Sequence, residues 1–171
     1  MRRQNGGEPI LRPAGDGWES GVAFNAAVVA VTKADRQDET AARLLGAAGL
    51  DPILHRFPDP LLSPDAHASA PDYLGVEDPR ITRIDDRFVM VYCGCGKAGD
   101  TWRATLCTAE SSDLLNWRKC GPIDLRYVDE CAPSTGHVNN KDGVLFPDRI
   151  DGWYYLLHRP MIGPLSTWSV G

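Results

Sequence analysis

The sequence lacks an excess of positive charge and lacks any apolar stretch of membrane-spanning length. Its formal net charge is −5 over 171 residues, so it has no basic footprint for nucleic acid. The start, Met1-Arg2-Arg3 followed by polar residues, has no apolar run of the kind found in a secretory signal. No window approaches the roughly 20 apolar residues of a spanning helix. These absences predict a cytoplasmic protein that binds neither nucleic acid nor membrane.

The chain has five cysteines, and their spacing lacks the pattern of a common metal-binding motif. Cys93 and Cys95 are two residues apart in an apolar run, so they share a face if that run is a strand. The other three, Cys107, Cys120 and Cys131, are scattered. The odd number and the missing signal favour reduced thiols. We expect the cysteines to be buried small apolar side chains, with no metal site and no cofactor; a zinc or redox site on Cys93 and Cys95 is the less favoured alternative.

Convincing amphipathic helical patterns are also missing. Hydrophobic residues make up 43% and charged residues 24% of the chain, which is ordinary for a globular domain. The apolar runs are short, and Gly and Pro turns separate them, which predicts an all-β fold. Residues 40–50 allow a short helix, but their place in a repeat favours a strand at 44–48. Further strands are expected near residues 81–84, 87–95, 102–109, 144–146, 153–159 and 166–170, with a polar loop at 63–72.

Two phrases of the sequence occur twice at almost the same spacing. Residues 83–92 match residues 149–158 at an offset of 66, since each begins Arg-Ile-Asp and runs through a turn into apolar residues. Residues 47–56 match residues 109–118 at an offset of 62. This indicates stacked supersecondary units. Four strands per unit fit a propeller blade better than a sandwich, although chance similarity between polar hairpins is the alternative.

The segment 140–160 carries the densest set of candidate functional residues. Lys141 and Asp142 precede an apolar run, an Asp-Gly turn follows, and a second run ends in His158 and Arg159. Two antiparallel strands joined by a tight turn would bring Asp142 and Arg159 to one rim. A carboxyl beside a guanidinium suits chemistry on a sugar or a phosphate. From the residues alone, however, Asp142 capping the local backbone is the simpler interpretation.

Three segments of the chain resemble glycoside hydrolase family 130, the inverting β-mannoside phosphorylases and related mannosidases. They are residues 9–27, residues 75–81 (Gly-Val-Glu-Asp-Pro-Arg-Ile) and the segment 140–160; residues 112–117 look like a blade-closing phrase of related propellers. The resemblance covers nearly the whole chain in the family's order. It implies a five-bladed β-propeller, of which this chain holds roughly two and a half blades. The blades are expected at about residues 19–64, 76–122 and 138–171.

The resemblance also implies roles for individual residues. Asp142 matches the general acid, which protonates the leaving oxygen through a sugar hydroxyl. Inorganic phosphate, the co-substrate, attacks the anomeric carbon of a β-mannoside oligosaccharide from the opposite face and releases α-mannose 1-phosphate. Arg159 matches a phosphate-binding arginine, with His158 beside it. The remaining implied sugar contacts are Asn25, Asp78, Arg80 and Lys141. A homo-oligomer is left open.

Each of these residues also has a structural alternative. Asp78 and Arg80 can form an ion pair between blades, Arg159 can be a solvated strand end, and Asn25 can bridge buried backbone. Lys141 can hold Asp142 ionised. The five tryptophans are expected to pack between blades rather than to serve as sugar platforms.

Two features depart from the family's pattern. Residues 32–39 form a charged segment where the family has a strand ending in Tyr-Arg, so that sugar-binding arginine is unassigned; Arg36 and Arg43 are candidates. The chain also has about half the length that the blade count requires, and the other phosphate ligands would lie beyond Gly171. We therefore expect weak or no activity from this chain alone. A β-mannoside hydrolase of the same family and a non-catalytic carbohydrate-binding propeller remnant are the alternative functions.

Overall fold

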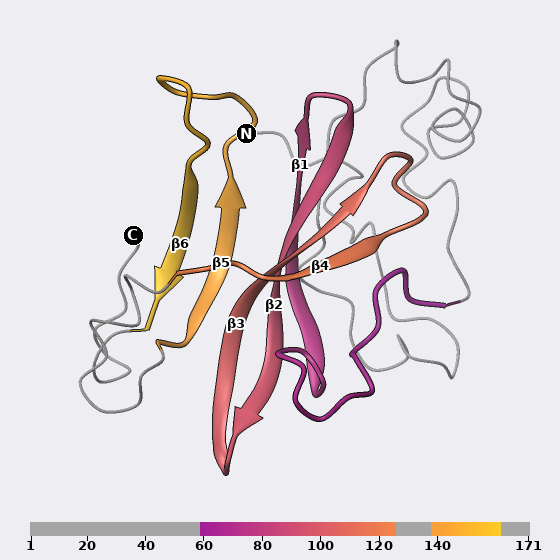
Figure 1. Cartoon of the computed structure of the whole chain (residues 1–171), viewed down its shortest axis with the longest axis vertical. Helices are drawn as coiled ribbons and strands as arrows, with labels where there is room; N and C mark the ends of the chain where they lie inside the picture. Colours follow the sequence, from indigo (N-terminus) through magenta and orange to yellow (C-terminus); the bar gives the residue numbers. More distant parts are fainter. Residues whose placement is uncertain (1–58, 126–137, 162–171) are drawn as a thin grey trace, which may run out of the picture. The chain divides into compact units, whose positions relative to one another are not determined.

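Six β-strands form the regular structure of the residues that the computed structural model describes, 59–125 and 138–161 (Figure 1). The first sheet contains β1 (Gly75–Ile84), β2 (Arg87–Ala98), β3 (Thr101–Ser111) and β4 (Arg118–Pro122), paired in chain order and antiparallel. The second sheet pairs β5 (Asn140–Leu145) with β6 (Leu156–Pro160), also antiparallel. The two described ranges hold no helix, hence none long and apolar enough to cross a membrane. The all-β prediction is confirmed for this part of the chain.

The repeated Arg-Ile-Asp phrases both lead into tight turns, which differ in their backbone angles. Ile84 pairs with Arg87 in the first, and Ile150 pairs with Trp153 in the second. Asp85 has a φ of 53° in the first turn, whereas Asp151 and Gly152 have φ values of 51° and 83° in the second. Two successive positive φ angles are what a type I′ hairpin turn requires, and Asp-Gly supplies them at low cost.

Both faces of the first sheet are buried around the middle of β2 and β3. One face carries the cluster of Met90, Tyr92, Cys107 and Ala109, against which Trp117 packs. The other face carries Val91 and Leu106, with 1% and 2% of their surface exposed. Gly143 of β5 lies directly on these two side chains, because it has no side chain of its own. Packing on this second face thus holds β5 against the sheet.

Several expectations need correction. Cys120 is exposed, because it lies on the short edge strand β4, which the sequence did not indicate. The aromatic run expected to begin a strand at Trp153 is largely outside β6, and Trp153 itself is 73% exposed, so it does not pack in a core. Cys93, Cys95 and Cys107 are buried as expected.

Other expectations lie outside the described residues. They are Asn25, Arg36, Arg43, Cys131 and the strands expected at 44–48 and 166–170.

Candidate active site

A β-bulge in β5 places Asp142 against Arg159. Lys141 pairs with Arg159 and Val144 pairs with Leu157, so two residues of β5 face one residue of β6. Asp142 occupies the bulge with a φ of 56°, a conformation that aspartate tolerates better than most residues. Its Oδ2 accepts a hydrogen bond from Arg159 Nε at 2.6 Å. The expected meeting of these two residues is confirmed, while their chemical roles stay predictions.

The two partners differ in their exposure. The side chain of Asp142 is 38% exposed, whereas that of Arg159 is 21% exposed. A ligand can therefore reach the carboxyl from solvent. The guanidinium is held more deeply, between the strand and its carboxylate partner. This arrangement keeps an accessible carboxyl in one orientation beside a fixed cation.

A second bulge of the same kind lies on β1. Glu77 pairs with Cys93 and Arg80 pairs with Val91, so Asp78 and Pro79 form the bulge. Asp78 has a φ of 50°, close to that of Asp142. The two bulges occupy corresponding places in the two repeats. Each consists of an aspartate followed by Pro or Gly. Non-glycine residues with positive φ concentrate at functional sites, which draws attention to both aspartates.

Lys141 connects the two bulges. Its Nζ donates a hydrogen bond to Glu77 Oε2 at 2.8 Å and lies 3.8 Å from Asp78 Oδ2. It also lies 5.6 Å from the centre of the Trp102 ring. Among the described residues, Lys141 is paired with β1 rather than with its chain neighbour Asp142. The alternative that Lys141 holds Asp142 ionised is therefore not what the structure shows.

The charges of Glu77 and Lys141 support each other. The hydrogen bond from Lys141 holds the pKa of Glu77 below its ordinary value. Burial lowers the pKa of Lys141, but the hydrogen bond to Glu77 and nearby negative charge outweigh burial, so its pKa is raised. Both groups are accordingly charged at neutral pH. Glu77 was not among the candidate residues predicted from the sequence; its position just before the Asp-Pro bulge was the available signal.

His158 and Arg80 have local partners. His158 is buried, and its Nδ1 lies 3.0 Å from Asn140 Nδ2 and 3.1 Å from Asn140 Oδ1. Burial lowers the pKa of His158, which favours the neutral ring. Because side chains alternate along a strand, His158 and Arg159 point to opposite faces of β6. Arg80 donates a hydrogen bond from Nη1 to the Pro79 carbonyl oxygen at 3.0 Å.

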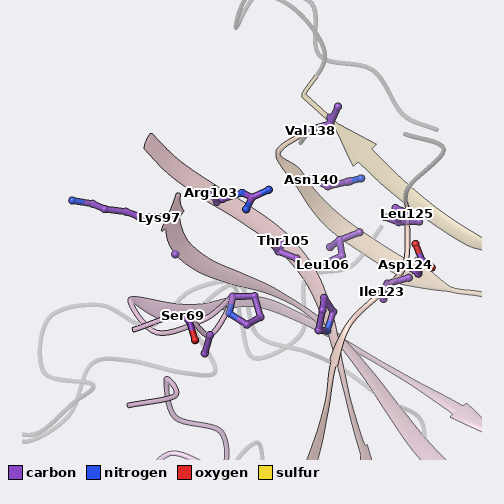
Figure 2. Close-up of a pocket in the computed structure, with 14 residues that line it drawn as sticks. Ser69, Lys97, Arg103, Thr105, Leu106, Ile123, Asp124, Leu125, Val138 and Asn140 are labelled. Atoms are coloured by element: carbon purple, nitrogen blue, oxygen red, sulfur yellow. The ribbon is translucent and has the colours of Figure 1, made fainter. Parts of the chain in front are cut away.

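The described residues also enclose a pocket of about 480 Å³ (Figure 2). It is lined by residues 69–71, the facing ends of β2 and β3, residues 122–125 and the start of β5, including Asn140. Lys97 extends away from the other labelled side chains (Figure 2). Neither Asp142 nor Arg159 lines this pocket. Although the pocket is large enough for a sugar, it is not the expected sugar site, because the paired carboxyl and guanidinium lie outside it.

Comparison with known proteins gives a consistent result. The sequence model of glycoside hydrolase family 130, described as beta-1,4-mannooligosaccharide phosphorylase, matches residues 19–168. A 1,2-beta-oligomannan phosphorylase of Thermoanaerobacter sp. (strain X514) is 30% identical over 168 residues, covering 89% of this chain and 51% of the relative. A beta-1,2-mannobiose phosphorylase of the same organism is 31% identical, with coverages of 90% and 53%. The chain thus spans about half the length of these curated relatives.

Among solved structures, the beta-1,2-mannobiose phosphorylase from Listeria innocua in complex with beta-1,2-mannobiose is similar to this chain. It matches with a TM-score of 0.46 and 28% identity, covering 64% of this chain and 26% of that protein.

Proposed function

Because the chain belongs to glycoside hydrolase family 130, we propose that it acts on β-mannosides and cleaves them by phosphorolysis to α-mannose 1-phosphate. The family match over residues 19–168 supports this. So do the two relatives that match about nine tenths of the chain, which are phosphorylases of β-1,2-linked mannosides. The proposed substrates are a β-mannoside oligosaccharide and inorganic phosphate, with the β-1,2 linkage favoured over the β-1,4 linkage.

The observation that carries the proposal is the pair formed by Asp142 and Arg159. Inverting phosphorolysis needs a proton donor for the leaving oxygen and a cation that holds phosphate on the opposite side of the sugar ring. An arginine presents five N–H groups in a rigid fork, so one guanidinium can hold a carboxylate and a phosphate at once. Arg159 uses Nε for Asp142. The hairpin thus places the carboxyl and the guanidinium side by side, and the protonated form of Asp142 is the proton donor.

In the proposed reaction, the proton of Asp142 passes through a sugar hydroxyl to the glycosidic oxygen. The bond between this oxygen and the anomeric carbon breaks, while a phosphate oxygen forms a new bond to that carbon from the opposite face. Arg159 holds the phosphate, whereas His158, which was expected beside it, faces the other side of β6 and pairs with Asn140. We assign contacts with the sugar to Asn25, Asp78, Arg80 and Lys141, of which Asn25 lies outside the described residues.

We further propose that the fold is a five-bladed propeller with blades at about residues 19–64, 76–122 and 138–171 in this chain. The first sheet supports the second blade, since β1 to β4 extend from Gly75 to Pro122. The matching bulges at Asp78 and Asp142 support an equivalent place for β1 and β5 in successive blades.

The experiment is an assay of the protein, as its gene encodes it, with β-1,2- and β-1,4-mannobiose in the presence and absence of phosphate. Phosphorolysis predicts that α-mannose 1-phosphate appears and that turnover requires phosphate. Free mannose formed equally well without phosphate would identify the hydrolase alternative and contradict the proposal. Sugar binding without turnover, unchanged in Asp142→Asn, would identify a binding propeller instead.

A further inference from the structure

Three possible metal ligands converge on one face of the β1–β2 hairpin. The carboxylate of Glu77 and the thiols of Cys93 and Cys95 each offer a ligand atom, and these atoms all lie within 4.8 Å of one another. The three residues belong to adjacent antiparallel strands, since Glu77 pairs directly with Cys93. Cys95 lies two residues further along β2, on the same face. The register of the hairpin therefore assembles the cluster without help from a loop.

The cluster is buried on the thiol side and open on the carboxylate side. Cys93 and Cys95 are 1% and 5% exposed, and both are free thiols. The side chain of Glu77 is 48% exposed. An ion can therefore enter past the carboxylate and reach the thiols. In tetrahedral zinc coordination with Zn–S bonds of about 2.3 Å, two sulfur atoms lie roughly 3.8 Å apart, a spacing that falls within the 4.8 Å limit on the separation of the three ligand atoms.

The electrostatics of the cluster suit a divalent cation. Two thiolates and one carboxylate around a divalent ion leave one negative charge. Lys141, which donates to Glu77 Oε2 at 2.8 Å, offsets that charge. A lysine that would repel a lone cation thus stabilises the complete cluster.

A disulfide fits this geometry less well than a metal ion. Residues two apart in a strand have Cα atoms about 6.7 Å apart, at the far end of the range of about 4.4–6.8 Å in disulfides. Two thiols and a carboxylate that share a face instead match the ligand set of a zinc site with an open fourth position.

We propose that Glu77, Cys93 and Cys95 bind one thiophilic divalent ion, with Zn²⁺ or Cd²⁺ as the class of ligand and Lys141 as the neutralising neighbour. Binding displaces one proton from each of the two thiols and forms two metal–sulfur bonds and one metal–oxygen bond. The three ligands take no part in the proposed mannoside chemistry, which shares only Lys141 with this site.

The test is a titration of the reduced protein with Cd²⁺, followed by the ultraviolet charge-transfer absorption of Cd–thiolate bonds. We expect a band that saturates at one equivalent and that Zn²⁺ abolishes by competition. Cys93→Ser and Cys95→Ser should each lose the band, whereas Cys120→Ser, at an exposed thiol outside the cluster, should keep it. Bands of equal size and affinity in all three variants, or no saturable band in the wild type, would overturn the proposal.

A second variant covers the case in which a buried cysteine variant does not fold. Glu77→Gln leaves both thiols in place and changes a side chain that is half exposed. We expect it to weaken Cd²⁺ binding about tenfold or more, as loss of a supporting ligand does. An affinity equal to that of the wild type would show that the carboxylate is no ligand and would contradict the three-residue site.

Discussion

Replacement of Gly143 by alanine tests how tightly β5 is held on the first sheet. A Cβ at this position would lie 2.5 Å from Val91 Cγ1 and 3.2 Å from both terminal carbons of Leu106, whereas carbon atoms in contact are normally about 3.5–4.0 Å apart. Val91 and Leu106 are among the most buried side chains described, so β5 itself has to move. Overpacking of this kind costs about 1–3 kcal/mol. We expect the free energy of unfolding to fall by that amount.

The measurement is urea unfolding followed by tryptophan fluorescence, where a loss of this size shifts the midpoint by about 1 M. Gly75→Ala is the matched control, because a Cβ at Gly75 would meet its nearest neighbour, Cys95 Cβ, at an ordinary 3.7 Å. Its free energy of unfolding should change by no more than about 0.5 kcal/mol. Equal midpoints for the two variants would refute the close packing of β5 beside Asp142.

Two further predictions concern buried titratable or charged groups. Burial lowers the pKa of His158 below its ordinary 6.5, so the unfolded chain takes up a proton at a higher pH than the folded chain. As the pH falls from about 6.5 to the lowered pKa of the folded state, the protein should therefore lose stability. His158→Gln should remove this loss in urea midpoints measured above and below that pH, and an unchanged pH profile would contradict it. Lys119→Met removes the cation paired with Asp72, whose side chain is 3% exposed, and should cost about 3 kcal/mol. Because Asp72→Asn/Lys119→Met leaves no buried charge, it should recover much of that loss in the same assay, and no recovery would count against the ion pair.

The central hairpins were predictable from the sequence because their apolar runs and turns are local signals. The Arg-Ile-Asp phrases marked both turns, and β2 and β3 appear close to where they were expected. Strand β4 was not predicted because Arg118-Lys119-Cys120 has little apolar character, which is typical of an edge strand. The start of β6 was misplaced because aromatic residues suggest a strand even where they are exposed.

The candidate site was predictable only in part. The hairpin pattern indicated that Asp142 and Arg159 meet, but the bulge that joins them lies where Gly143 packs on the first sheet, a contact that no local pattern signals. Likewise, the link from Lys141 to Glu77 spans 64 residues and follows from packing between strands. Asp-Pro in β1 and Asp-Gly in β5 were the available hints of bulges, since both dipeptides interrupt regular strands.

The most direct measurement compares two substrates in Asp142→Asn. Asparagine tolerates the positive φ of the bulge but cannot supply the proton. If Asp142 is the general acid, phosphorolysis of mannobiose should fall by about 10²–10⁴-fold, while a β-mannoside with a dinitrophenyl leaving group, which needs no proton, should react nearly as fast as with the wild type. Asp151→Asn, at an exposed turn with a φ of 51°, should leave both rates unchanged. An equal loss on both substrates, or no loss on either, would contradict the assignment of Asp142 as the proton donor.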